Sequence, residues 1–322
     1  MPENDFVYAV ARIRAKELSL LSAAFLEQLL ALPDEAAGLK LLNEHGWGSA
    51  GQDAGTVLSE ERRKTWALIS ELTGGQMEIF DVFRCESDYH NLKAAVKDSC
   101  SETHIPGIYV EDGVIPAQLI REAAETHDFS ALPKQMAAAG AEAMELLLKT
   151  GDGQLCDCVL DQAALIDMRD AGKRSGEELL AHYGELRCAA ANIKTAVRAC
   201  RTGKDREFLQ RALAPCETLN LSQLTEAAMS GMEAICSYLE HTDYADAVGE
   251  LKKSPSAFER WCDNSVIRSI RPQLYNSFGP GPLAAFILAR ENEIRTVRII
   301  LSGKRNRMEE GVIRERVREM YV

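Results

Sequence analysis

Apolar residues recur every three or four positions along most of the chain, which is the spacing of one buried helix face. Near the N-terminus this spacing predicts one helix over residues 18–32, ended by Pro33-Asp34. A second apolar run at residues 39–42 leads to a stop at His45-Gly46. The apolar positions of the first run are Leu18, Leu21, Phe25, Leu29 and Leu32.

Residues 59–62 have the composition of a helix start. Ser59 is a favoured N-cap residue, and Glu60 and Glu61 would complement the helix dipole in the first turn. We therefore expect a helix to begin here and to end at Gly74-Gly75. The acidic pairs Glu177-Glu178 and Glu309-Glu310 are interpreted in the same way, as helix starts rather than proton-transfer groups.

Three segments resemble one another at a constant interval. Residues 89–97, 190–198 and 292–300 contain segments that align with two successive offsets of 101 residues, from position 91 to 192 and from 192 to 293. In each copy an apolar residue is followed by a base, and a small or β-branched residue follows two positions after the base. The apolar–base pairs are Leu92-Lys93, Ile193-Lys194 and Ile294-Arg295. The pattern predicts the same helical turn, buried on one face, three times over.

A second resemblance recurs at nearly the same interval, because residues 155–161 resemble residues 257–263 with an offset of 102 from Asp161 to Asp263. Together the two recurrences predict three helical modules of about a hundred residues, an ordinary size for a small domain. We place these modules at residues 1–125, 126–225 and 226–322. Residues 103–116, with Pro106-Gly107 and Asp112-Gly113, are expected to form an irregular connection.

Composition supports an all-α fold. Of the 322 residues 46% are hydrophobic and only 6% aromatic, and helix-forming residues are abundant. The formal net charge of −12 argues against nucleic-acid binding, because such a surface repels phosphate backbones. Bases nevertheless gather between Arg290 and Arg318, which is either a solvated face or a surface that meets an acidic partner.

Motifs for catalysis are missing from the sequence. Gly203-Lys204 and Gly303-Lys304 lack the first glycine and the hydroxyl residue of a phosphate-binding loop. The nine cysteines form no Cys-x-x-Cys pair, and no histidine lies at ligand spacing from them, so we expect reduced thiols. The sequence thus predicts no catalytic, cofactor or metal residues. The longest uncharged run, residues 272–289, contains three prolines and is not expected to cross a membrane.

The most specific stretch is C-terminal. Phe278-Gly279-Pro280 predicts a rigid turn that starts a helix, which we expect Gly303 to end. A last helix is expected to carry Arg314 and Arg318 in one i,i+4 row, beside a row of Glu315 and Glu319.

This C-terminus resembles that of the C subunit of bacterial and archaeal V/A-type ATPases, a relative of the eukaryotic V-ATPase d subunit. The similar features are the Phe-Gly-Pro turn, the run from Glu291 to Arg295, Gly303-Lys304 and the terminal Met320-Tyr321-Val322, together with residues 8–15. The resemblance implies three similar helical domains in a pseudo-threefold funnel. It also implies a non-catalytic central-stalk rotor subunit that joins the central shaft to the cytoplasmic face of the membrane ring and transmits torque.

The basic residues of the repeated helix are the candidate interface: Lys93, Lys194, Arg295 and Arg298. We expect Lys93, Lys194 and Arg295 to be equivalent in the three modules, either contacting a partner or covering their own module. Two alternatives stay open beside the rotor subunit. One is a helical repeat scaffold unrelated to rotary ATPases. The other is a soluble enzyme that uses Asp161, Asp263 or the cysteines.

Overall fold

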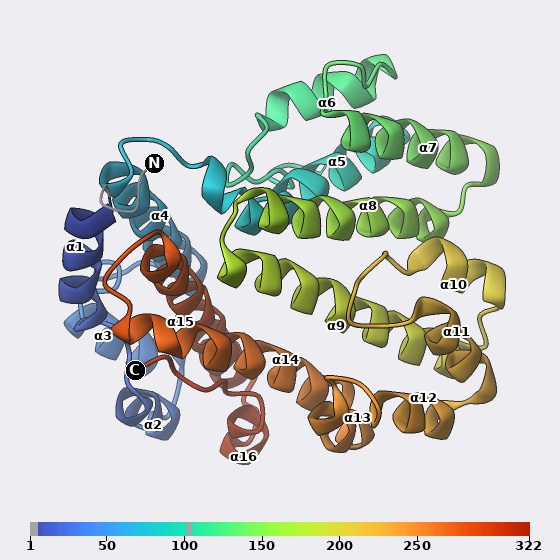
Figure 1. Cartoon of the computed structure of the whole chain (residues 1–322). Coiled ribbons are helices and arrows are strands. Elements are labelled where there is room, and N and C mark those ends of the chain that lie inside the picture. Colours follow the sequence, from blue (N-terminus) through green and yellow to red (C-terminus); the bar gives the residue numbers. More distant parts are fainter. Residues whose placement is uncertain (1–5, 102–104) are drawn as a thin grey trace. The chain divides into compact units, whose positions relative to one another are not determined.

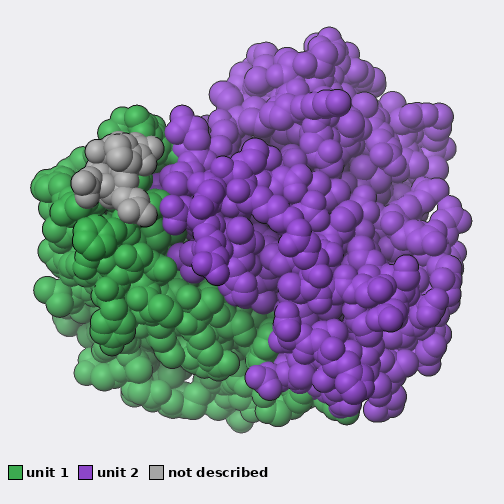
Figure 2. Space-filling view, in the orientation of Figure 1, with its two compact units in different colours: residues 1–77, 249–322 green, residues 78–248 purple. Residues whose placement is uncertain are grey.

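The structure, a computed structural model, describes residues 6–101 and 105–322, and every regular element within these ranges is a helix (Figure 1). The all-α prediction is therefore confirmed. The chain divides into two units, residues 1–77 with 249–322, and residues 78–248 (Figure 2). The first unit therefore combines the two ends of the chain, and each unit is described by itself below.

The first unit contains the N-terminal helices and the C-terminal helices. They are α1 (Val7–Glu17), α2 (Ala23–Ala31), α3 (Glu35–Glu44), α4 (Ala54–Leu72), α13 (Val248–Lys253, whose first residue falls in the other unit), α14 (Pro255–Ile270), η4 (Arg271–Tyr275), α15 (Gly281–Arg305) and α16 (Glu310–Arg314). Helix α15 packs against α1, α2, α3, α4 and α14, so it is the centre of this unit.

The sequence of α15 explains its central position. Every residue from Gly281 to Arg290 is buried, so this end of the helix is surrounded by protein. The helix begins after Pro280, and Gly279 has a φ of +69°, so the predicted rigid turn that starts the helix is confirmed. Further along, Ile294, Val297 and Leu301 join Leu29 and Leu42 in the hydrophobic core.

The second unit contains the middle of the chain. Its elements are η2 (Glu78–Phe83), α5 (Cys85–Ser99), α6 (Ala117–Thr126), α7 (Lys134–Thr150), α8 (Gly153–Arg174), α9 (Glu178–Thr202), α10 (Arg206–Ala212), α11 (Leu221–Ser230), α12 (Met232–Leu239) and η3 (Ala245–Ala247). Residues 105–116 lack regular structure, as predicted, whereas Thr103 and His104 lie outside the described residues.

Helices α8 and α9 approach each other closely because glycines face the contact. A Cβ on Gly172 would lie 2.5 Å from the carbonyl oxygen of Leu180, and a Cβ on Gly184 would lie 3.0 Å from the Cα of Arg169. Any side chain at these positions would push the two backbones apart. The other face of α8 packs on α5 and α7, where Leu92, Met136 and Leu160 form a buried core.

The predicted single helix over residues 18–32 is wrong. Helix α1 ends at Glu17, Leu18 is 89% exposed, and a new helix begins at Ala23. The hydroxyl of Ser22 accepts a hydrogen bond from Phe25 N at 3.2 Å and so caps α2. The cap at Ser22 therefore divides the predicted helix into two. The apolar spacing still identified core residues, since Leu21 and Leu29 are both fully buried.

The predicted helix start at residues 59–62 is also wrong. Helix α4 begins at Ala54, capped by Asp53, whose Oδ1 accepts from Thr56 N at 3.1 Å. Glu60 and Glu61 therefore lie inside the helix, and Glu61 is buried. The predicted end is right, since α4 ends at Leu72 and is followed by Gly74 and Gly75.

Two C-terminal predictions need correction. Gly303 does not end α15, which continues to Arg305; a Cβ on Gly303 would lie 2.6 Å from Ile313 Cγ1. The glycine is needed for close packing rather than for a left-handed turn. The predicted last helix is only five residues long, Glu310–Arg314, so Arg318 and Glu319 lie beyond it in an irregular segment.

The two units are defined by packing, whereas the three modules were inferred from recurrence in the sequence. The module boundaries at residues 125 and 225 therefore stay a prediction. The packing does repeat in one respect: α5 lies against α8 in the second unit, and α15 lies against α14 in the first.

Candidate interaction site

The three recurring segments lie on α5, α9 and α15 (Figure 1). Leu92, Ile193 and Ile294 are all buried, and each is followed by its base. Ala95, Ala196 and Val297 are buried one turn further along. In each copy the base therefore lies beside the buried face rather than on it.

Lys93 covers its own unit. Its Nζ lies 2.6 Å from Asp161 Oδ1 and 4.0 Å from Asp157 Oδ1, both on α8. Lys97, one turn along α5, pairs with Asp157 at 2.6 Å. These ion pairs link α5 to α8. Lys93 could therefore pair with a carboxylate of another subunit only if it also kept, or gave up, its ion pair with Asp161.

Lys194 on α9 is exposed and has no ion-pair partner among the described residues. The residues around it are nevertheless the best buried of the three copies, since Asn192, Ile193 and Ala196 are at most 1% exposed. Its backbone is therefore fixed while its ammonium group faces solvent. Among the bases of the three apolar–base pairs, Lys194 is the one without an ion pair in the described parts of the chain.

Arg295 and Arg298 lie one turn apart on α15 and differ in their surroundings. Arg295 pairs with Asp263 on α14, and Arg318 Nε lies 3.0 Å from the other oxygen of the same carboxylate. Arg298 is exposed and has no ion-pair partner in the described parts of the chain. Partial burial, together with the positive charges of Arg62 and Arg295, lowers the pKa of Arg298.

Asp161 and Asp263, the aspartates of the second recurrence, make the same kind of contact. Each carboxylate pairs with the base of a recurring helix, Lys93 or Arg295. The connectivity differs, because α8 follows α5 in the chain whereas α14 precedes α15. Both aspartates are therefore engaged in ion pairs between helices.

Sequence reasoning missed a buried polar residue that precedes the apolar–base pair in every copy. Asn91, Asn192 and Glu293 occupy this position and are 0%, 1% and 2% exposed. Each accepts a hydrogen bond from a backbone N–H of a non-helical segment: Val110 at 2.9 Å, Ala214 at 2.9 Å, and Leu21. The signal was present as Asn-Leu-Lys and Asn-Ile-Lys, but only the apolar residue and the base were interpreted.

The two asparagines also donate back to the same residues. Asn91 Nδ2 donates to Val110 O at 2.8 Å, and Asn192 Nδ2 donates to Ala214 O at 2.7 Å. In the first unit two asparagines share this role: Glu319 N donates to Asn264 Oδ1, and Asn292 Nδ2 donates to Glu319 O, both at 2.9 Å. Side-chain amides thus hold irregular segments against the recurring helices.

Glu293 belongs to a buried ionic network between α15 and α4. Arg290 donates to Glu293 Oε2 at 2.5 Å and to Glu61 Oε2 at 2.6 Å, and its guanidinium lies 4.7 Å from the ring centroid of Trp47. Burial raises the pKa of Glu293 to about 7, although Arg290 and the Leu21 N–H oppose that shift. One buried arginine therefore serves two buried carboxylates.

Three features of the described residues bear on metal binding, phosphate binding and membrane crossing. They contain no group of three or more His, Cys, Asp or Glu side chains placed to hold a metal ion. Gly203 caps α9 with a φ of +64°, and Gly303 lies within α15, so neither glycine forms a phosphate-binding loop. No helix in the described ranges combines the length and the apolar character that crossing a bilayer requires.

Comparison with known proteins gives a consistent result. The chain is 23% identical to the V-type sodium ATPase C subunit of Enterococcus hirae, over 96% of this chain and 97% of that protein. It is 25% identical to the V-type ATP synthase C subunit of Thermus thermophilus, over 92% and 93% of the two chains. It is 23% identical to the A-type ATP synthase C subunit of Methanocaldococcus jannaschii, over 93% and 82%.

The family described as ATP synthase (C/AC39) subunit matches residues 9–316, a range that begins in α1 and ends just beyond α16. The match therefore includes all three recurring helices and both units of the fold. With nearly the whole chain covered, the protein belongs to the ATP synthase (C/AC39) subunit family.

Proposed function

We propose that this chain is the non-catalytic rotor subunit that links the central shaft of a V/A-type ATPase or ATP synthase to its membrane ring. In that place it would transmit torque and so couple ion transport to ATP hydrolysis or synthesis. The observation that carries the proposal is the family match over residues 9–316. The relatives' names, each a C subunit of a V-type or A-type enzyme, agree with it.

The proposed position is peripheral, on the cytoplasmic face of the membrane ring. The lack of a membrane-crossing helix among the described residues is compatible with attachment through other subunits. The proposed partners are the shaft subunits on one side and the ring on the other. Close-packed helices suit a part that must resist twisting, because protein interiors have low compressibility.

We also propose that three modules form a pseudo-threefold funnel. Support comes from the recurring helices, which share a buried apolar residue and a buried polar residue at the same register. The repeated pairing of α5 with α8 through Lys93 and Asp161, and of α15 with α14 through Arg295 and Asp263, supports it further. The module boundaries proposed remain those at residues 125 and 225.

Lys194 and Arg298 are the candidate interface residues best suited to a partner, because each is exposed and lacks an ion-pair partner in the described structure. Lys93 and Arg295 already pair with Asp161 and Asp263. We therefore assign Lys93 and Arg295 to holding helices together, and Lys194 and Arg298 to contacts with other subunits.

The rotor role can be tested by reconstitution. Purified ATPase head with its shaft, and the membrane ring in vesicles, are combined with or without this chain. We expect ATP hydrolysis in both preparations but ATP-driven ion transport only when the chain is present. Equal transport without the chain would remove the proposed coupling role. Binding of the chain to neither shaft nor ring would instead favour a repeat scaffold outside the rotor.

A further inference from the structure

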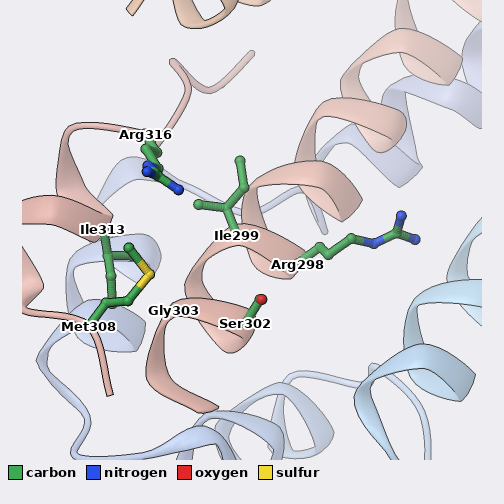
Figure 3. Close-up of a pocket in the computed structure, with 7 residues that line it drawn as sticks. All are labelled: Arg298, Ile299, Ser302, Gly303, Met308, Ile313 and Arg316. Carbon is green, nitrogen blue, oxygen red and sulfur yellow. The ribbon is translucent and has the colours of Figure 1, made fainter. Parts of the chain in front are cut away.

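Two adjoining hollows lie in the first unit where the C-terminal segment folds back on α15. The smaller is about 200 Å³, and Ile299, Ser302 and Gly303 of α15 line one side of it (Figure 3). The larger is about 760 Å³ and continues toward residues 30–36, between α2 and α3. Met308 and Ile313 line both hollows. We call the joined surface the C-terminal groove, with Met308 and Ile313 as its floor.

Four arginines surround this floor: Arg298 and Arg316 at the smaller hollow, and Arg305 and Arg307 at the larger one. All four are exposed and have no ion-pair partner among the described residues. In Figure 3 the Arg316 side chain points toward Ile299, whereas the Arg298 guanidinium extends away from Met308 and Ile313. The two guanidinium groups therefore point in different directions from the hollow that both residues line.

The acidic residues of the groove do not neutralise these cations. Asp34 caps α3 by accepting from Ala37 N at 2.9 Å, and Glu310 pairs with Arg314 at 2.7 Å. Glu35 is the one lining carboxylate without such a bond among the described residues. Four uncommitted positive charges therefore gather around an apolar floor in a chain whose net charge is −12.

The floor is held in place by backbone contacts rather than by exposed side chains. Met308 N donates to Gly303 O at 2.9 Å, and Arg307 has a left-handed φ of +53° that turns the chain back. Ile313 lies directly over Gly303, where a Cβ would leave no room for it. Because the surface is already ordered, a partner loses little affinity to ordering it.

We propose that the C-terminal groove binds an acidic segment of another subunit of the same ATPase complex. An aliphatic or aromatic side chain of that segment would contact the half-buried Met308, which lies with the buried Ile313 at the bottom of the groove, and its carboxylates would pair with the arginines that line the hollows. Burying the apolar contact supplies affinity, and the opposite charges supply orientation and faster association. The inference rests on the proposed function only in taking the partner from that complex.

Charge reversal tests the proposal with the full-length chain. The variant Arg298→Glu/Arg316→Glu is compared with Lys40→Glu/Arg63→Glu, a control that reverses two exposed bases elsewhere in the first unit. Binding to the purified shaft subunits and to the ring is measured at low and at high salt. We expect the groove variant alone to lose at least about tenfold in affinity toward one of them, with a weaker salt dependence.

Equal affinity of the groove variant, the control and the unmodified chain would overturn the proposal. A circular-dichroism melt of both variants separates a lost contact from a lost fold. If a variant unfolds, the neutral Arg298→Gln/Arg316→Gln chain replaces it, and we expect a smaller loss of affinity in the same direction.

Crosslinking in the assembled complex identifies the occupant. A photoreactive benzoylphenylalanine replaces Ser302, which lines the smaller hollow, and the crosslinked peptide is sequenced. We expect a segment of another subunit that contains Asp or Glu beside an apolar residue. A crosslink to a second copy of this chain, to lipid, or to nothing would sink the inference. Reconstitution that still needs the chain for coupling would then leave the rotor role standing.

Discussion

The side-chain amide of Asn192 holds the backbone of Ala214 with two hydrogen bonds, donating to its carbonyl oxygen at 2.7 Å and accepting from its N–H at 2.9 Å. Asn91 makes the same two bonds to Val110, 101 positions earlier. The match indicates that the recurrence in the sequence preserves a way of fixing the segment that crosses the helix. In both copies the apolar face positions the helix in the core, and the buried asparagine amide positions the non-helical segment beside it.

Replacing Asn192 by alanine should therefore destabilise the fold. The change leaves the buried N–H of Ala214 without its partner, and leaves its C=O only a 3.8 Å contact from Cys188 Sγ, which costs about 1–3 kcal/mol. Equilibrium urea unfolding measures the loss. Lys194→Ala, on the same helix but exposed, is the control and should stay within about 0.5 kcal/mol of the unmodified chain. Equal stability of the two variants would show that the amide bonds contribute nothing.

Arg290→Met should be among the most damaging substitutions in the first unit. It leaves Glu293 buried without a cation, whereas Glu61 keeps a 2.6 Å contact with Lys64. Removing one partner of a buried ion pair costs about 3–5 kcal/mol. Arg62→Met removes a partly exposed contact to Glu291 and should cost at most about 1 kcal/mol. Similar unfolding midpoints for the two variants would contradict the importance of burial here.

The pKa of Glu293, which burial raises to about 7, predicts a pH dependence of stability. The folded state then holds a proton that the unfolded chain releases near pH 4.5. Stability contributed by the protonated carboxyl is complete below pH 4.5 and is lost as pH rises toward 7, by at most about 1.4 kcal/mol per pH unit. Glu293→Gln cannot titrate, so its unfolding free energy should vary less between pH 5 and pH 7.5. Parallel pH profiles would refute the assignment.

The sequence was informative wherever local chemistry and packing agreed. The Gly279-Pro280 turn, the stops at His45-Gly46 and Gly74-Gly75, and the buried residues of the three recurring helices could all be predicted. The all-α class followed from composition. These features depend on residues close together in the chain or on a simple helical period.

The errors arose where a residue's role depends on contacts distant in sequence. Glu61 follows a serine and another glutamate, as a first-turn residue would. It is instead a buried residue inside α4, because its partner Arg290 lies 229 positions away in the sequence. Gly303 is a residue type that often ends helices. In this fold a glycine is needed there because Ile313 packs against it and leaves no room for a Cβ. The ion pairs of Lys93 and Arg295 also depend on tertiary packing. The sequence alone therefore could not distinguish these two bases from Lys194 and Arg298.

Cys216 should react with alkylating reagents faster than Cys85 and Cys156. Hydrogen bonds from Cys188 and from Asn192 outweigh burial and lower the pKa of Cys216 to about 7. Burial raises the pKa of Cys85 to about 12 and that of Cys156 to about 11. Because the thiolate is the nucleophile, iodoacetamide at pH 7.5 should modify Cys216 well before those two residues. Peptide mass spectrometry over time checks the order, and modification of Cys85 first would contradict it.

Two helical glycines should respond to the same substitution in opposite directions. Gly172 faces α9, where an added Cβ meets the Leu180 carbonyl oxygen at 2.5 Å, so Gly172→Ala should cost about 1–3 kcal/mol. Gly249 in α13 has nothing within 4 Å of an added Cβ, so Gly249→Ala should instead stabilise the protein by about 0.4–1 kcal/mol. Alanine improves the helix propensity at both sites, and only the neighbouring backbone differs. If Gly172→Ala raised the unfolding midpoint as Gly249→Ala should, α8 and α9 could not lie as close as described.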